Sequence, residues 1–199
     1  MSTARKPSLR EMQKELTRHR MIESALSVFD RKGFTATTMD DIAGEAVLSR
    51  ATIYLHFENK TDILRAAVAQ LPDLMALLHA IFEACDRPAR HAAFEALNDY
   101  WLAYLGPVWR HVREAAATDA DMRAWVMHFV RDQTAMVQQA LERAGVPAAA
   151  AQPRAFLMMC LWHEYVYRTD DAARELDPAA AVDALTDLFD AAAAPPVGP

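Results

Sequence analysis

The sequence predicts an all-helical protein with a small amino-terminal domain of short helices and a larger helical domain behind it. Apolar residues recur at helical spacing in almost every segment, and no segment shows the sustained alternation that indicates a half-buried strand. Residues 1–60 hold ten basic and eight acidic residues, whereas residues 61–199 hold eleven and nineteen, within a net charge of -6. This asymmetry favours a basic module joined to an acidic one.

Length and composition limit the class of protein. With 199 residues and 53% hydrophobic residues, the chain can bury a substantial core. Residues 1–20 contain no apolar segment of signal-peptide length, and the longest apolar run, residues 155–162, is too short to cross a bilayer. We therefore expect a cytoplasmic protein with no membrane contact. Cys85 and Cys160 lie far apart within apolar runs, which predicts small buried thiols rather than a disulfide.

Helix start and stop signals divide the first sixty residues. A first helix over about residues 10–32 is expected to end at Gly33. Thr38 is predicted to cap a short second helix that ends near residue 46, and Ser49 to cap a third helix of about seven residues. Asn59 is the next predicted cap. The basic segment at residues 4–14 is predicted to be a disordered arm or an extension of the first helix.

The helices after residue 60 are predicted to be longer. Pro72 lies inside the first of them and is expected to kink or split it, because proline cannot donate an intrahelical hydrogen bond. Gly145 is expected to end one helix, and Asp177 with Pro178 to begin another. The predicted ranges are about 60–84, 88–105, 107–117, 119–144, 152–169 and 178–193.

The stretch "LSRATIYLHFENK", residues 48–60, has the composition of a helix that binds a nucleic acid. Three short helices joined by tight turns match the helix-turn-helix pattern, in which the third helix enters the DNA major groove. Helical spacing turns Ile53 and Phe57 inward. The opposite face is predicted to contact bases through Arg50, Ala51, Thr52 and Leu55, and its flanks to contact phosphates through Thr38, Tyr54, His56 and Lys60.

These residues resemble the TetR (tetracycline repressor) family of bacterial regulators over about residues 17–69. The resemblance rests on many positions at fixed spacing, in "ALSVFDRKGFTATTMDDIA" and "LSRATIYLHFENKTDIL". It implies a homodimer that binds a near-palindromic operator in double-stranded DNA, and a variable helical domain that holds a small-molecule effector and the dimer interface. Residues 1–58, with a basic arm, would form the DNA-binding domain, and residues 59–199 the effector-binding and dimerisation domain.

Two positions depart from the family pattern. Val47 stands in the turn before the third helix, where the family usually has glycine, and a left-handed backbone is costly for a β-branched residue. The turn therefore either takes another conformation or is strained. Gly44 lies inside the second helix and is expected to weaken it by about 1 kcal/mol relative to alanine.

Large apolar side chains recur at helical spacing in the carboxy-terminal region. Such stripes are usually core, but in the context of the family they also predict a pocket for an apolar or aromatic ligand. The pocket candidates are Trp101, Tyr104, Trp125, Phe129, Met136, Met159 and His163.

The segment "RAFLMMCLWHEYVY" is apolar nearly all round, as expected for a helix that is buried on more than one side. Together with the last predicted helix, it is expected to form the interface of a homodimer. The interface candidates are Phe156, Leu161, Leu185, Leu188 and Phe189.

No arrangement of residues indicates an enzyme, a cofactor or a metal site. The chain has no glycine-rich phosphate loop and no histidine and cysteine residues at zinc-ligand spacing. A ligand-responsive repressor is therefore the leading hypothesis. The alternatives are a regulator controlled by a protein partner, an activator without a small-molecule effector, and a helical carrier or enzyme with an incidental helix-turn-helix. An exposed patch of basic, hydroxyl and aromatic residues on the third helix would argue against the last of these.

Overall fold

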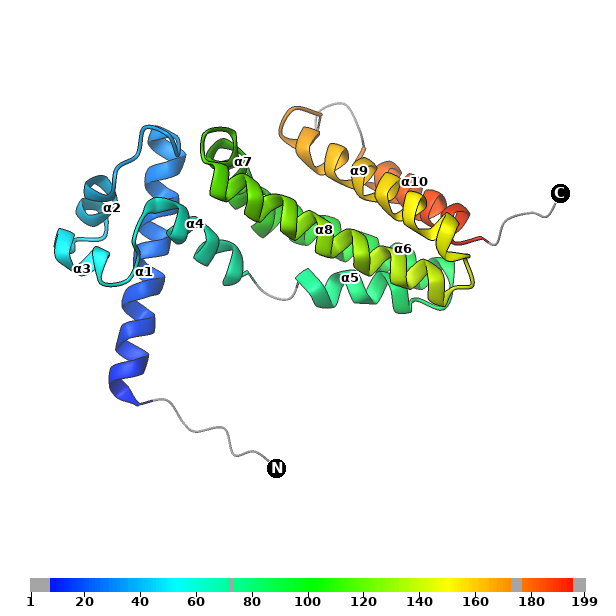
Figure 1. The fold of residues 1–199 in the computed structure, drawn as a ribbon, viewed down its shortest axis with the longest axis horizontal. Helices are drawn as coiled ribbons and strands as arrows, with labels where there is room; N and C mark the ends of the chain where they lie inside the picture. Colours follow the sequence, from blue (N-terminus) through cyan, green and yellow to red (C-terminus); the bar gives the residue numbers. More distant parts are fainter. Residues whose placement is uncertain (1–7, 72–73, 173–176, 195–199) are drawn as a thin grey trace. The chain divides into compact units, whose positions relative to one another are not determined.

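The structure is a computed structural model that describes residues 8–71, 74–172 and 177–194. In these ranges every regular element is a helix (Figure 1), which confirms the predicted all-helical class. The chain divides into two compact units. Unit 1 comprises Met1–Leu71 and Val108–Arg123, and unit 2 comprises Pro72–Pro107 and Ala124–Pro199. The predicted division at residue 58 is one of function and stays a prediction.

Unit 1 contains the three helices predicted for the first sixty residues, the helix that follows them, and part of two helices from further along the chain. Its helices are α1 (Leu9–Lys32), α2 (Met39–Glu45), α3 (Arg50–Tyr54), α4 (Lys60–Ala69), most of α7 (Gly106–Thr118) and the first turn of α8 (Ala120–Arg143). Helix α1 packs against α2 and α4, and α2 packs against α3. The core side chains that are almost fully buried include Met21, Phe29, Ile42, Ile53, Ile63 and Leu64.

The predicted caps begin the helices of unit 1. The side chains of Thr38, Ser49 and Asn59 each accept a hydrogen bond from the backbone N–H three residues later. Ser8 caps α1 in the same way, so the basic segment is helical from Leu9 onward. The part of the predicted arm before Ser8 lies outside the described residues. Local side-chain chemistry therefore sets where each of these helices begins.

The turn between α2 and α3 is strained at Val47. Its φ angle is 55°, and among the described residues other than glycine it alone has a positive φ. The Leu48 amide donates to the Ala43 carbonyl oxygen at 2.9 Å, so the chain reverses as it does where glycine ends a helix. A left-handed conformation costs an L-residue about 1–2 kcal/mol. Packing of α2 against α3 therefore overrides the local preference of valine.

Unit 2 contains α5 (Leu74–Glu83), α6 (Arg87–Tyr100), the π-helix η1 (Trp101–Leu105), most of α8, α9 (Ala148–Ala172) and α10 (Pro178–Ala193). Helix α6 packs against α5 and α10, and α10 also packs against α9. The helix predicted over residues 60–84 is split, because α4 ends at Ala69 and α5 begins at Leu74. Pro72 itself lies outside the described residues.

The π-helix changes which side chains unit 2 buries. Pro107 follows it and cannot donate to a carbonyl oxygen four residues earlier, and the Gly106 amide instead donates to the oxygen of Trp101, five residues back. A Cβ on Gly106 would lie 3.0 Å from that oxygen. The wider turn places Leu105 in the core and leaves Tyr104 55% exposed.

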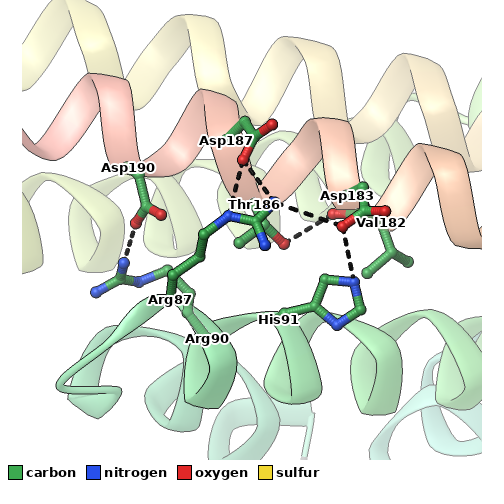
Figure 2. A network of polar contacts seen from close by, with 8 residues as sticks. All are labelled: Arg87, Arg90, His91, Val182, Asp183, Thr186, Asp187 and Asp190. Atoms are coloured by element: carbon green, nitrogen blue, oxygen red, sulfur yellow. Dashed lines mark hydrogen bonds and ion pairs between the residues drawn. The ribbon is translucent and has the colours of Figure 1, made fainter.

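A ladder of ion pairs joins α6 to α10 (Figure 2). Arg87 donates to Asp187 at 2.6 Å, His91 lies 3.2 Å from Asp183, and Arg90 donates to Asp190. The Arg90 guanidinium also lies 5.2 Å from the ring centre of Phe189. The ladder therefore holds α10 along the face of α6.

The structure also bears on the expected lack of membrane spans and on the two cysteines. None of the helices in the described ranges is long and apolar enough to span a membrane. The prediction of buried thiols is wrong, since Cys85 and Cys160 are both exposed. Cys85 follows the end of α5, and Cys160 lies on an outward face of α9, although both stand in apolar stretches of sequence.

Candidate nucleic-acid interface and apolar cavity

Helix α3 has one buried and one exposed face, as its sequence predicts. Ile53 is fully buried and Phe57 nearly so, and these side chains anchor the helix to unit 1. On the opposite face Arg50 and Ala51 are exposed, and Leu55 is 81% exposed. The buried side chains thus lie on one side of α3, and Arg50, Ala51 and Leu55 lie on the other.

Arg50 is held from two sides. Its Nη1 donates to Asp40 Oδ2 at 3.2 Å, and its Nε lies 3.2 Å from Asp40 Oδ1. Its guanidinium also lies 5.7 Å from the ring centre of Tyr54, within range of a cation–π interaction. No local pattern in the sequence indicates this pair, because the two residues are ten positions apart and lie on either side of a turn.

The remaining polar candidates differ in whether their side chains already have hydrogen-bond partners within the protein. The Thr52 hydroxyl lies 2.7 Å from that of Ser49, and the Thr38 hydroxyl donates to Asp41 at 2.8 Å. His56 Nδ1 is buried without a hydrogen-bond partner. Burial, and then the nearby charges of Lys14 and Arg18, lower the pKa of His56. Its imidazole is therefore neutral at pH 7 and would contact a phosphate through a neutral N–H.

Lys60 makes bonds inside the protein that its sequence position did not predict. Its Nζ donates to the carbonyl oxygens of Phe34, Thr35 and Thr37 at 2.6, 3.0 and 2.9 Å. The ammonium also lies 4.5 Å from the ring centre of Phe34. Since an ammonium has three donors, the predicted phosphate contact would have to replace one of these bonds.

Glu114 of α7 binds the same loop through its amide groups. Its carboxylate accepts from the N–H of Phe34 at 2.9 Å and of Thr35 at 2.8 Å. Burial alone would raise the pKa of Glu114, but these amide bonds outweigh it and the pKa lies below its ordinary value. Lys60 and Glu114 together form what we call the loop clamp, which fixes residues 33–37. The partners of Glu114 are 79 and 80 residues away, so the sequence held no local signal for it.

A second contact joins α7 to α1. Asp30 accepts from Arg110 and lies 2.7 Å from Nε2 of the buried His111, whose ring packs 5.6 Å from that of Phe29. Nearby, Thr61 of α4 donates to Asp119 at 3.2 Å. The short helices that carry the candidate interface are thus braced by residues 108–119.

Comparison with known proteins agrees with this geometry. Residues 21–67, which run from the middle of α1 into α4, match the family model described as bacterial regulatory proteins, tetR family. Over residues 21–67 the chain is thus similar to the tetR family of transcriptional regulators. The family model describes regulatory proteins, and the expectation that this chain is not an enzyme stays a prediction.

Individual relatives match the chain to different extents. An Escherichia coli K12 protein named "Probable acrEF/envCD operon repressor" is 33% identical over 100 residues, which cover 50% of this chain and 44% of that protein. The chain therefore matches less than half the length of that relative. A transcriptional regulator from Pseudomonas aeruginosa PAO1 has the same fold with a TM-score of 0.73, at 23% identity over 90% of this chain and 91% of the other. The SmeT–triclosan complex has a TM-score of 0.72, at 19% identity over 89% and 91% of the two chains.

Unit 2 contains a small apolar cavity that is partly open to solvent. Its volume is about 60 Å³, and its lining comes from α5, α6, α8, α9 and α10. Ring contacts join its wall, since Phe189 packs 5.6 Å from Phe82 and 5.9 Å from Phe94. Pockets for drug-sized ligands have volumes of about 300–1,000 Å³. The cavity in this conformation therefore has the chemistry of an apolar ligand site, but not the size.

The predicted pocket residues are only partly gathered at this cavity. Met159 lines it, and Trp101 packs edge-on against Trp162, which also lines it. Trp125 and Phe129 stack on each other along α8, and Tyr104 points outward for the reason given above. Met136 and His163 are half-buried, and burial lowers the pKa of His163.

The predicted interface residues lie on α9 and α10. Phe156, Leu161 and Leu188 are 60%, 51% and 50% exposed, whereas Leu185 is half-buried and Phe189 is buried. Leu157, which the prediction did not include, is also exposed. Leu161, Leu185, Leu188 and Phe189 also line the cavity. The apolar surface of α9 and α10 is thus continuous with the cavity wall.

Proposed function

We propose that this protein is a tetR-family repressor that binds a near-palindromic operator as a homodimer and is released by a small apolar or aromatic ligand. The observation that carries the proposal is the exposed face of α3, where Arg50, Ala51 and Leu55 face outward from a helix anchored by Ile53 and Phe57. A helical carrier or an enzyme would have no use for this patch.

In the proposed complex α3 lies in the major groove. The small side chain of Ala51 lets the backbone approach the bases, Leu55 packs against a thymine methyl group, and Arg50 donates to a guanine. Thr52 reaches a base edge once its hydroxyl turns from Ser49. The phosphate contacts come from Tyr54, whose phenol is exposed, and from Thr38 and His56 on either side.

A homodimer is supported by the apolar surface of unit 2. Phe156, Leu157 and Leu161 are exposed along α9, and Leu188 is exposed on α10. A soluble monomer rarely exposes a continuous apolar patch of this kind, and a second copy of the same surface would cover it. Two copies would present two α3 helices, as a near-palindromic operator requires.

A ligand of apolar or aromatic chemistry is supported by the lining of the cavity. Its wall is formed by leucine, methionine and aromatic side chains, and the SmeT structure, which shares the fold, is a complex with triclosan. Methionines such as Met158 and Met159 adapt readily to a ligand's shape. Expansion of this cavity would displace the helices around it, and the same displacement would oppose operator binding.

The small size of the cavity favours one second candidate. A volume of about 60 Å³ holds no effector of drug size, so this cavity would have to widen to admit one. A regulator controlled by a protein partner, or an activator without a small-molecule effector, needs no larger cavity. The apolar surface of α9 and α10 would then bind that partner.

Binding equilibria distinguish these candidates. Operator duplexes selected from a randomised pool are titrated with the protein, alone and with each member of a library of apolar and aromatic compounds. We expect a compound that quenches tryptophan fluorescence to weaken operator binding, and saturating operator to weaken compound binding by the same factor, because coupling is reciprocal. A library that yields no such compound would favour the protein-partner candidate, and failure to select any duplex would contradict the repressor itself.

A further inference from the structure

We propose that Asp40 is a positioning residue that orients Arg50 for base recognition and thereby sets specificity at one base pair of the operator. The inference rests on the proposed function, since it concerns how α3 reads DNA. Asp40 is the second residue of α2 and Arg50 the first residue of α3. Their side chains meet through the 3.2 Å hydrogen bond from Nη1 to Oδ2 and the 3.2 Å approach of Nε to Oδ1.

The pair leaves Arg50 able to recognise a base. A guanidinium has five N–H groups, and its hydrogen bond to Asp40 engages one of them. Guanine is recognised by two parallel donors, which the remaining groups can supply. The Arg50 side chain is 67% exposed, so without an anchor it would sample many rotamers. Asp40 on one side and the ring of Tyr54 on the other restrict that sampling before DNA arrives.

The placement of Asp40 is unfavourable for binding DNA as such. Its side chain is 58% exposed beside the face that would meet a polyanion, so its charge repels phosphates within a Debye length of about 8–10 Å. Phosphate contacts supply non-specific affinity, and base contacts supply specificity. A carboxylate here therefore lowers affinity for all sequences while it keeps Arg50 directed at a base, which raises the ratio of specific to non-specific binding.

The other carboxylates of α2 have different partners. Asp41 closes the capping box with Thr38 and pairs with Lys32 at 2.7 Å. Glu45 pairs with Arg31 of α1 at 2.6 Å. Within α2, Asp40 is thus the carboxylate that reaches the recognition helix. Glu45 offers a matched control, because Glu45→Gln removes the same charge from the same helix without touching Arg50.

The test compares base preference among the wild type and five variants. These are Asp40→Asn, Asp40→Glu, Arg50→Ala, Glu45→Gln and the double variant Asp40→Asn with Arg50→Ala. Each selects duplexes from one randomised pool, and affinities are then measured for the wild-type consensus, its single-base-pair variants and a scrambled duplex. Arg50→Ala should lower the preference at one base pair by about 5- to 150-fold. Asp40→Asn should lower preference at that same base pair by about two- to fivefold, the range open to an exposed ion pair, and should tighten binding to the scrambled duplex.

The remaining outcomes separate the inference from the proposed function. Glu45→Gln should leave base preference unchanged, and the double variant Asp40→Asn with Arg50→Ala should match Arg50→Ala. Uniformly tighter binding by Asp40→Asn, with base preference intact, would overturn the positioning role and leave the repressor standing. An unchanged preference in Arg50→Ala would overturn it as well. If the wild type selects no consensus, both the proposed function and this inference fail. Rescue of the preference by Asp40→Glu would support the role, because glutamate restores the carboxylate.

Discussion

Charged side chains bind the backbone of the turns in unit 1, whereas the helices of unit 2 are joined by apolar contacts and by ion pairs between side chains. In unit 1, Lys60 and Glu114 bind the carbonyl and amide groups of one loop, and Arg20 donates to the Ala46 carbonyl oxygen at 3.2 Å. In unit 2, aromatic pairs such as Trp101 with Trp162 join the helices, and the ion pairs of α6 and α10 lie mostly at the surface. Directional bonds fix a geometry, while apolar contacts tolerate repacking. Under the proposed function unit 1 would read DNA and unit 2 would adapt to a partner or ligand, and the contrast suits that division.

The largest expected effect comes from a charge on the apolar surface of unit 2. Leu161→Arg should abolish the dimer and lower operator affinity by about 100-fold or more, because binding to two half-sites at once is lost. Light scattering should give a mass near 22.2 kDa for the variant and twice that for the wild type.

A matched substitution shows whether position or charge is responsible. Leu102→Arg changes another exposed leucine of unit 2 and should leave the dimer intact. A wild-type mass of 22.2 kDa at micromolar concentration would contradict the dimer.

Exposed Cys160 lies next to Leu161 in the predicted interface. A thiol-reactive cross-linker should therefore join two copies of the wild type, and Cys160→Ser should prevent this.

The next effect tests whether unit 1 depends on directional bonds. Lys60→Met leaves the carbonyl oxygens of Phe34, Thr35 and Thr37 without their donor and should lower the free energy of unfolding by about 2–3 kcal/mol. Lys32→Met, which breaks an exposed ion pair with Asp41, should cost about 1 kcal/mol or less. Urea denaturation of both variants measures the difference.

A different result would support the phosphate contact that the sequence predicts for Lys60. If Lys60→Met leaves unfolding unchanged but weakens binding to all duplexes alike, with the salt slope lowered by about one, the lysine binds a phosphate.

Glu114, the second residue of the loop clamp, should make the free energy of unfolding depend on pH. The pKa of Glu114 is lower in the folded protein than in the unfolded chain. Its contribution is therefore fully present above the unfolded pKa of about 4.3 and is lost as pH falls through the folded value. Glu114→Gln should cost about 1–2 kcal/mol at neutral pH and reduce the loss of stability on acidification. Glu142→Gln, at an exposed carboxylate of α8, should keep the wild-type pH profile.

The smallest expected effects concern the helix-turn-helix backbone. Gly44→Ala should stabilise the protein by about 1 kcal/mol, since a Cβ there would meet no atom within 4 Å. Val47→Gly removes the strain of a left-handed valine but raises the conformational entropy of the unfolded chain. The net effect should be a gain of about 0.5–1 kcal/mol in the free energy of unfolding. Thermal melting of each variant checks these values. A lower melting temperature for Val47→Gly would mean that valine's exposed side chain contributes more than its backbone costs.

The sequence predicted local structure better than distant contacts. Thr38, Ser49 and Asn59 were found as caps because a cap needs only the amide three residues later. Glu114 was not found, because its partners lie in a loop about eighty residues away. Tyr104 was placed in the pocket on α-helical spacing, and the π-helix moved Leu105 into the core instead.

The α3 face could be predicted for a similar reason. Ile53 and Phe57 are four residues apart and share one side of a helix, so the opposite side had to face outward. The thiols show the limit of such reasoning, since hydrophobic neighbours in sequence did not bury Cys85 or Cys160.

The loop clamp has a further consequence for the behaviour of single backbone amides. Residues 33–37 form a loop between α1 and α2. Amide protons in loops usually exchange rapidly with solvent deuterium, because loops open at a low cost in free energy. The amides of Phe34 and Thr35 are bonded to the Glu114 carboxylate, so their protons should exchange as slowly as those of neighbouring helices. A short stretch of slow exchange between α1 and α2 would thus report, without any DNA present, whether residues 108–119 are packed against the rest of unit 1.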